Sequence, residues 1–264
     1  MKAVLTALIL SAVAAPAWAD NEQAGTEARW NDLRQAIFSD RAVEDGRGKI
    51  QLSAPARALD ASLVPVTMAL AGGQPVKSIY LVIDNNPSPL AAHISFGPAA
   101  DANRLTLRVR VDQYTMIHAV AETEDGKLYG TATFVKAAGG CSAPAGPDDE
   151  AALRDIGHMK LRLAGTYGPG KPLKAELLIR HPNFNGMQMN QVTRNYTPAW
   201  FARTTDVTFE GRSVLHIESD ISISTDPAIG FTFVPNGPGH LDVTVHDSKD
   251  ITYSHSFDVP GQAS

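Results

Sequence analysis

Short alternating segments separated by turns run through most of the chain, and this pattern limits its fold more than any other feature. In each segment, apolar or β-branched residues alternate with polar ones, as a half-buried strand requires. Between residues 50 and 136 the segments are VPVTMAL, VKSIYLVID, AAHISFG, RLTLRVRVD, MIHAVAET and KLYGTATFVK. Beyond residue 155 they are MKLRLAG, LKAELLIRHP, WFARTTDVTFEGRSVLHIESD, GFTFVPN, LDVTVHDS and ITYSHSFDV. The pattern predicts an all-β protein built from two immunoglobulin-like β-sandwich domains.

Two other stretches set the expected domain boundaries. The stretch GTEARWNDLRQAIF places Trp30, Leu33 and Ile37 on one face of a short helix before the first domain. A run poor in bulky apolar residues and rich in Gly, Ala, Pro and acids separates the two sets of strands. We therefore expect a first domain at 20–136, an arm and linker at 137–154, and a second domain at 155–264.

The first residues have the composition of a secretory signal peptide. Lys2 is followed by an apolar run that is too short to span a bilayer, and Ala17-Trp18-Ala19 matches a cleavage site. We assign residues 1–19 to this signal and expect a bacterial periplasmic protein. No later apolar run is long enough for a transmembrane helix, so no membrane partner is expected.

The charge balance argues against nucleic acid as a partner. The chain has 23 Lys and Arg residues against 28 Asp and Glu residues, which gives a formal net charge of −5. Binding to phosphates needs a basic patch, and the sequence contains no cluster of Lys or Arg.

A single cysteine, Cys141, lies in the stretch AAGGCSAPAGPDDE. An odd cysteine in an exported protein indicates either an intermolecular disulfide or a free reactive thiol. A buried inert cysteine is the common alternative, but it is expected inside an apolar strand rather than in a run of Gly and Pro. A flexible linker with an incidental cysteine is the other alternative. We expect an exposed Cys141 that is open to alkylation and able to link two chains as a homodimer.

The two residues before the thiol favour a mobile arm. Gly139 and Gly140 have no side chain and sample most of backbone space. Residues 137–140 could reach roughly 13 Å when extended. The thiolate is the nucleophile in sulfur chemistry, and Lys136 would favour it whereas the acids at 148–150 would oppose it.

His and Met residues raise a second hypothesis, a soft metal site of the kind that copper prefers. The candidates are His158, Met159, His181, Met187, Met189 and His240. Their spacing fits no established metal signature, and Met often only fills gaps in cores. We assign no metal ligand and no cofactor.

Several short motifs, taken in chain order, are similar to those of two protein families. The first half resembles SoxY, with Val64-Pro65-Val66, Asn86-Pro87-Ser88-Pro89, DGKLYGTATFVK and Gly139-Gly140-Cys141 as the matching segments. The second half resembles SoxZ, with His181-Pro182, Pro198-Ala199-Trp200-Phe201 and Asp226-Pro227 as the matching segments. The chain departs from the SoxY pattern after the thiol, where Ser142-Ala143-Pro144 replaces a second glycine pair and the chain continues.

The resemblance implies a carrier rather than an enzyme. SoxY and SoxZ form the periplasmic sulfur carrier of thiosulfate oxidation, and the fused order is similar to single-chain carriers associated with quinoprotein dehydrogenases. Cys141 would hold sulfur intermediates covalently, Gly139 and Gly140 would give the arm its mobility, and no residue would be catalytic. The implied partners are sulfur-oxidising enzymes or a quinoprotein dehydrogenase system. A non-covalent accessory of that system and a His/Met metal-binding module remain as alternatives.

Overall fold

The computed structural model describes residues 17–71, 75–143, 153–190 and 194–261. The expected signal peptide therefore lies almost wholly outside the described residues, as does most of the linker after Ala143. None of the helices in the described ranges is both long enough and apolar enough to cross a membrane.

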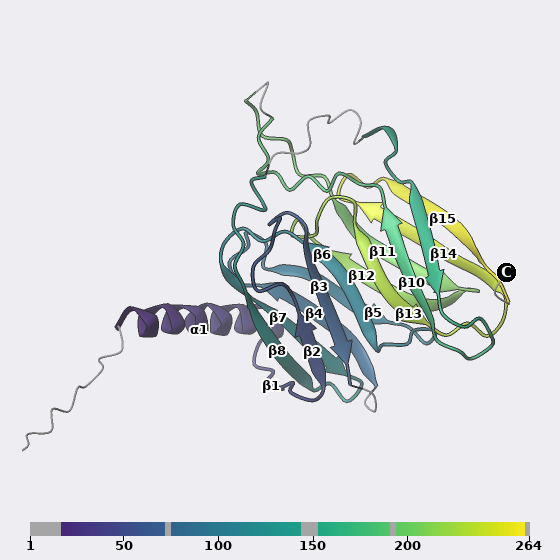
Figure 1. Ribbon diagram of the computed structural model, residues 1–264, viewed down its shortest axis with the longest axis horizontal. Coiled ribbons are helices and arrows are strands. Elements are labelled where there is room, and N and C mark those ends of the chain that lie inside the picture. The colour runs from purple at the N-terminus through teal and green to yellow at the C-terminus, as the bar shows by residue number, and fades with distance from the viewer. Residues whose placement is uncertain (1–16, 72–74, 144–152, 191–193, 262–264) are drawn as a thin grey trace, which may run out of the picture.

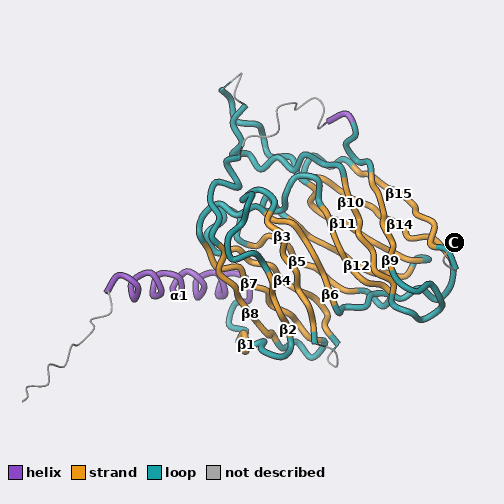
Figure 2. The backbone as a smooth tube through the Cα atoms, viewed as in Figure 1, coloured by secondary structure: helices purple, strands orange, loops and turns teal. Residues whose placement is uncertain are grey.

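The protein consists of two β-sheets packed face to face, with one helix at the N-terminal end (Figures 1 and 2). The helix is α1 (Ala17–Phe38). The first-domain strands are β1 (Val43–Asp45), β2 (Ile50–Ser53), β3 (Val64–Leu70), β4 (Val76–Ile83), β5 (Leu90–Phe96), β6 (Arg104–Val109), β7 (Thr115–Thr123) and β8 (Leu128–Val135). The second-domain strands are β9 (Met159–Ala164), β10 (Leu173–Ile179), β11 (Ala202–Phe209), β12 (Arg212–Ser219), β13 (Ala228–Phe233), β14 (Gly239–Asp247) and β15 (Thr252–Val259). The prediction of an all-β chain with two immunoglobulin-like sandwiches is confirmed.

Both sheets continue from the first domain into the second. The nine-stranded sheet has the order β1-β8-β7-β4-β5-β12-β11-β14-β15, and the six-stranded sheet has the order β2-β3-β6-β13-β10-β9. The two domains meet where β5 pairs with β12 and β6 with β13, both antiparallel. Each domain thus covers a strand edge that the other would leave open. The buried apolar side chains of both halves form one hydrophobic cluster.

Two glycines permit the close approach of strands at the line between the domains, which we call the seam. A Cβ atom on Gly97, directly after β5, would overlap the backbone carbonyl of Ser213 in β12. A Cβ atom on Gly230 in β13 would overlap the Thr106 hydroxyl in β6. A glycine within a strand often marks a site of close backbone approach, and here there is one in each sheet.

Helix α1 begins at Ala17, earlier than the stretch from which it was predicted, and its C-terminal half packs on the outer face of the nine-stranded sheet. Trp30 stacks on His118 of β7 with ring centroids 3.7 Å apart. Phe38 is buried with Val120 and Leu128 in a small second cluster. The rest of the helix projects away from the sheets (Figure 1).

We expect Gly97→Ala to destabilise the fold, because the clash is with backbone that cannot rotate away. Overpacking of this kind costs roughly 1–3 kcal/mol. Urea unfolding should show a lower midpoint for Gly97→Ala than for the wild type. Gly25→Ala is the control, since a Cβ atom on this helical glycine would meet no atom within 4 Å. Equal midpoints for all three proteins would contradict the close approach at the seam.

The shared sheets also predict that the two halves stay together after cleavage. A protease site engineered between residues 145 and 150 would cut the chain without touching any described strand. Because β5 and β12 pair over five residue pairs and the core is continuous, the fragments should co-elute as one species in size-exclusion chromatography. Fragments that separate without denaturant would show that the halves are only tethered.

Candidate functional site

The backbone around Cys141 is held against the end of β6. The Gly139 N–H donates to the Asp112 carbonyl at 2.8 Å, and the Gly140 N–H donates to the Val111 carbonyl at 3.0 Å. Gly139 and Gly140 thus run antiparallel to Val111 and Asp112, the segment after β6. Cys141 follows at the start of a turn that the Ala143 N–H closes on the Gly139 carbonyl at 2.9 Å, and its thiol lies within electrostatic range of Arg110.

The two glycines of the arm fit this docked position for steric reasons. A Cβ atom on Gly140 would overlap the Ala61 carbonyl oxygen and would lie 2.6 Å from the Val111 carbonyl oxygen. Gly139 has a φ of 78°, which lies in the left-handed region that residues with a side chain rarely adopt. The mobility of both glycines stays a prediction from the sequence. The structure shows a second reason for them, namely close packing.

Cys141 itself is buried, with 1% of its surface exposed. A side chain of the second domain holds its backbone, since the Asn185 Nδ2 donates to the Cys141 carbonyl at 2.6 Å. The expectation of an exposed thiol is therefore wrong for this conformation. The lack of an apolar pattern around the cysteine predicted exposure. The burial arises instead from loops and backbone of the two domains that meet there.

The surroundings keep the thiol protonated. Burial raises the pKa of Cys141 from its ordinary value of 9.0 to about 12, and the nearby Asp112 carboxylate adds to the rise. The Arg110 guanidinium acts in the opposite direction but does not overcome burial. Because the thiolate is the nucleophile, the docked thiol is poorly reactive at neutral pH.

Arg110 joins the two domains beside the thiol. It follows the last residue of β6 and is 2% exposed. Its Nη2 donates to the Asn183 carbonyl at 3.0 Å and to the Thr225 hydroxyl at 2.7 Å, both in the second domain. Its backbone N–H donates to the Ser222 carbonyl at 2.8 Å.

The Asn86-Pro87-Ser88-Pro89 turn fixes the segment to which the arm docks. The Asn86 Nδ2 donates to the Arg110 carbonyl at 2.8 Å and to the Ser222 hydroxyl at 3.0 Å. Its Oδ1 accepts from the Asp112 N–H at 3.0 Å. Ser88 extends the contact into the second domain by donating to Asp220 at 2.7 Å. One of the motifs that suggested the family resemblance therefore lies at the seam.

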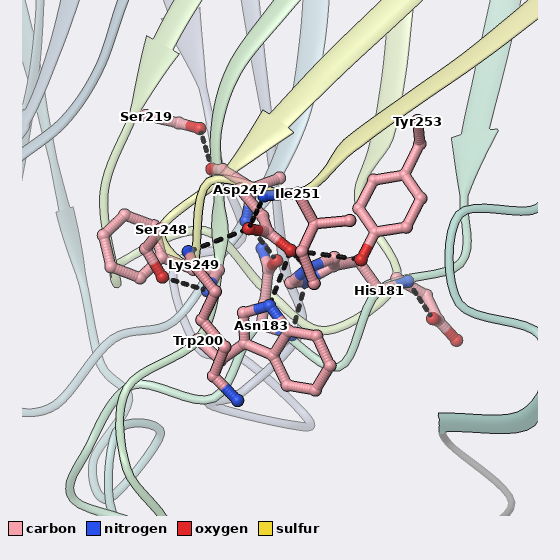
Figure 3. A network of polar contacts seen from close by, with 12 residues as sticks. His181, Asn183, Trp200, Ser219, Asp247, Ser248, Lys249, Ile251 and Tyr253 are labelled. Carbon is pink, nitrogen blue, oxygen red and sulfur yellow. Dashed lines mark hydrogen bonds and ion pairs between the residues drawn. The ribbon is translucent and has the colours of Figure 1, made fainter.

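The His181-Pro182 turn and the loop after it are held by a buried polar network around Asp247 (Figure 3). The Asp247 carboxylate accepts from Trp200 Nε1 at 2.6 Å, from the Tyr253 hydroxyl at 3.1 Å, and from the N–H groups of Lys249 and Ile251. Burial alone would raise the pKa of Asp247, but these hydrogen bonds lower it. The network keeps the loop in place.

The same loop carries the residues that contact the arm and Arg110. Asn183 accepts from the Ala202 N–H through its side chain and donates to His181 Nδ1 through its backbone at 3.1 Å. Burial lowers the pKa of His181, which keeps the ring neutral at pH 7. Asn185 lies two residues after Asn183 and donates to the backbone carbonyl of Cys141.

Two histidines of the metal hypothesis, His181 and His240, lie near opposite ends of β14. His181 is 3.7 Å from Asp247 at the C-terminal end of β14, whereas His240 is at the N-terminal end of that strand beside Glu210 and Asp258. Six to seven residues of strand correspond to roughly 20 Å. In the described part of the chain, no three His, Cys, Asp or Glu side chains form a group that could hold a metal ion.

Sequence reasoning found Cys141 and both turns but missed Arg110, Asn183 and Asn185. Arg110 continues the alternation of RLTLRVRVD, in which Arg104 and Arg108 are exposed, so nothing in the segment marks it as buried. The strand ends at Val109, and the alternation of buried and exposed side chains ends with it.

The fold and the site together define a two-domain β-sandwich protein with a single thiol docked between its halves. Comparison with known families then assigns the halves. The family described as Sulfur oxidation protein SoxY matches residues 34–141, and the family described as Sulphur oxidation protein SoxZ matches residues 161–258. The chain belongs to these families as a fused SoxY–SoxZ-like protein. The SoxY match ends at Cys141.

Two solved structures are similar to parts of the chain. The sulfur carrier protein SoxY from Chlorobium limicola f thiosulfatophilum is 26% identical, with a TM-score of 0.38, over 44% of this chain and 98% of that chain. A β-glycosidase from Bacteroides vulgatus is 11% identical, with a TM-score of 0.26, over 80% of this chain and 24% of that chain. A search of curated proteins gave no match.

The docked geometry predicts slow alkylation of Cys141 that becomes faster when the arm is displaced. Gly140→Val cannot dock without moving two carbonyl groups, so iodoacetamide should label it at least about tenfold faster than the wild type at pH 8, since each unit of raised pKa lowers the thiolate fraction tenfold. Ser142→Ala is the control, because its exposed hydroxyl makes only a 3.4 Å contact with Gly139.

The labelling rate of wild-type Cys141 should rise with pH. The docked thiol has a raised pKa, so docking favours the neutral form. The stabilisation that the docked position gains from the neutral thiol is complete below pH 9 and is lost as the pH rises toward 12. Wild-type labelling should therefore accelerate through this range and approach the rate of Gly140→Val. Equal rates for the two proteins at pH 8 would show that the arm does not rest in the seam.

Proposed function

We propose that the protein is a periplasmic carrier that holds sulfur intermediates covalently on Cys141 and presents them to sulfur-oxidising enzymes. The observation that carries this proposal is the docking of the only thiol of the chain, at the end of its SoxY match, into a seam built by both domains. The signal-like N-terminus supports export to the periplasm. The protein would be a substrate of its partner enzymes and not itself a catalyst.

Carriage requires two positions of the arm. In the docked position the thiol is neutral and covered, which protects it from unwanted exchange and oxidation. In the presented position, Gly139 and Gly140 leave their carbonyl partners and Cys141 leaves Asn185. The thiol then regains an ordinary pKa and can react.

The root of the arm is firm. The Lys136 N–H donates to the Ala56 carbonyl at 2.9 Å, and its carbonyl accepts from the Ala58 N–H at 3.2 Å. Movement is therefore confined to the residues from Ala137 onward. Five residues of extended chain cover roughly 17 Å, which is enough to carry the thiol out of the seam.

Loading forms a sulfur–sulfur bond on Cys141. Coupling of the thiolate with thiosulfate releases two electrons, so a loading enzyme must pass them to a redox cofactor of its own. Exchange with tetrathionate needs no oxidant, because the thiolate displaces thiosulfate and keeps the other half as an S-thiosulfonate. A quinoprotein dehydrogenase system remains the other proposed partner, with the protein acting there as an accessory.

The same mechanism limits dimer formation. A Cys141-linked homodimer requires two undocked arms to meet, and the docked thiol is not accessible to a second chain. We therefore place the disulfide-linked dimer in the presented state only.

Tetrathionate provides the test. Intact protein incubated at pH 8 should gain about 112 Da, the mass of one S-thiosulfonate, and lose it again with a reducing thiol. Cys141→Ser should gain nothing, and Gly140→Val should load faster than the wild type. The carrier proposal fails if the native protein stays unmodified while the same protein in denaturant is fully converted.

A further inference from the structure

The Arg110 guanidinium has an unused hydrogen-bond donor in the buried seam. Its Nη2 is occupied by Asn183 and Thr225. Its Nε is buried and has no hydrogen-bond partner among the residues that the structure describes. A buried charged donor without an acceptor is costly, and such a group in a native structure calls for an explanation.

The position of Arg110 supplies that explanation. The hydrogen bonds of Gly139 to Asp112 and of Gly140 to Val111 hold the arm beside the residues that follow Arg110, and Cys141 is the next residue of the arm. Both residues are also tied to the same loop of the second domain, Arg110 through Asn183 and Cys141 through Asn185. The thiol and the guanidinium therefore share one buried site. Attraction to Cys141 in its ionised form is the largest influence that opposes the effect of burial on the pKa of Arg110, so an anion at this position interacts with the guanidinium.

The nearby acids do not neutralise this charge. Asp60 is exposed, and its Oδ1 accepts from the backbone and the hydroxyl of Ser62. Asp112 is partly exposed, so its field is screened more than that of a buried group. Arg110 is the buried member of the set, and a cation in such a place is expected to be paired.

An empty carrier provides no anion for the free donor, because the docked thiol is neutral. A loaded carrier does provide one, since an S-thiosulfonate ends in a sulfonate that is anionic at any physiological pH. Resting on the carrier function proposed above, we propose that Arg110 is a cargo-binding residue: its Nε–H binds the anionic end of a sulfur group on Cys141 when the arm lies in the seam. The arm then docks more strongly loaded than empty.

The assignment gives Arg110 a role beyond joining the domains. A charge-assisted hydrogen bond in a buried site is among the stronger polar interactions of a protein. It would hold an anionic cargo in the covered position, where a small thiol cannot reach the sulfur–sulfur bond. A neutral group attached to Cys141 through the same kind of sulfur–sulfur bond would form no charge-assisted hydrogen bond with the guanidinium. This difference between anionic and neutral adducts separates cargo binding from a purely structural role.

The experiment compares two adducts on the full-length protein. Tetrathionate gives the anionic S-thiosulfonate, and methyl methanethiosulfonate gives the neutral methyl disulfide through displacement of methanesulfinate. Release by dithiothreitol is followed by intact mass and divided by the release rate of the same adduct on free cysteine. Four proteins are measured: the wild type, Arg110→Gln, Arg110→Lys, and the control Arg108→Gln, which removes an exposed arginine of β6 two residues before Arg110.

We expect Arg110→Gln to release the S-thiosulfonate about tenfold to a hundredfold faster than the wild type, the range that one buried charge-assisted hydrogen bond supports. Release of the methyl disulfide should change by less than about threefold, as for an interaction that the neutral group does not make. Arg110→Lys should restore part of the protection of the anionic adduct, and Arg108→Gln should resemble the wild type for both adducts.

Two results would overturn the assignment. Equal acceleration of both adducts in Arg110→Gln would show that Arg110 only holds the seam together. If that variant does not fold, the wild type alone decides: after division by the free-cysteine rates, the anionic adduct must be protected more than the neutral one, and equal protection refutes the proposal. Failure to form either adduct would instead count against the carrier function itself.

Discussion

The pairing of β5 with β12 is the interaction on which the rest of the molecule depends. It makes one sheet out of two domains and, with the contact of β6 and β13, fixes which loops of the two halves lie together (Figure 1). The end of β6, the Asn86 turn and the loop from His181 to Trp200 meet because the strands that carry them are in register. Arg110 then crosses from one half to the other. The thiol site is assembled from segments that neither domain could bring together alone.

Few hydrogen bonds hold the arm in the seam. Three hydrogen bonds hold the backbone of the arm to its surroundings, those of Gly139, Gly140 and Cys141. Each contributes roughly 0.5–1.5 kcal/mol net. Ordering the backbone costs roughly 1–2 kcal/mol for each residue fixed. The hydrogen bonds alone therefore do not offset the ordering of residues 137–141, and docking also depends on the burial of Ala137 and Cys141.

The sequence predicted the strands well because each carries its own period-2 pattern. Val64, Val66 and Met68 alternate as the pattern requires and all are buried in β3. It also located Cys141 and the two turns, which have distinctive local chemistry. It could not reveal the seam, since the pairing of β5 with β12 joins segments about 120 residues apart and is not contained in either segment alone. Arg110 and Asn185 were missed for the same reason, because their role exists only where the two halves meet.

Fusion of the two halves tethers the thiol on both sides. Cys141 is tethered on one side at Lys136, and on the other the chain enters the second domain, where the Gly157 N–H bonds to the Arg180 carbonyl at 2.8 Å. The shorter tether has five residues and so keeps the thiol within roughly 17 Å of its root, beside the seam. If the protein is the carrier proposed above, an enzyme that receives the thiol must approach the seam, where it would meet the loop that carries Asn183 and Asn185. Exposed Tyr196 lies on that loop, and exposed Leu59 and Leu63 flank the residue against which Gly140 packs. A partner would contact both domains at once, which makes their fixed relative placement part of the recognition surface.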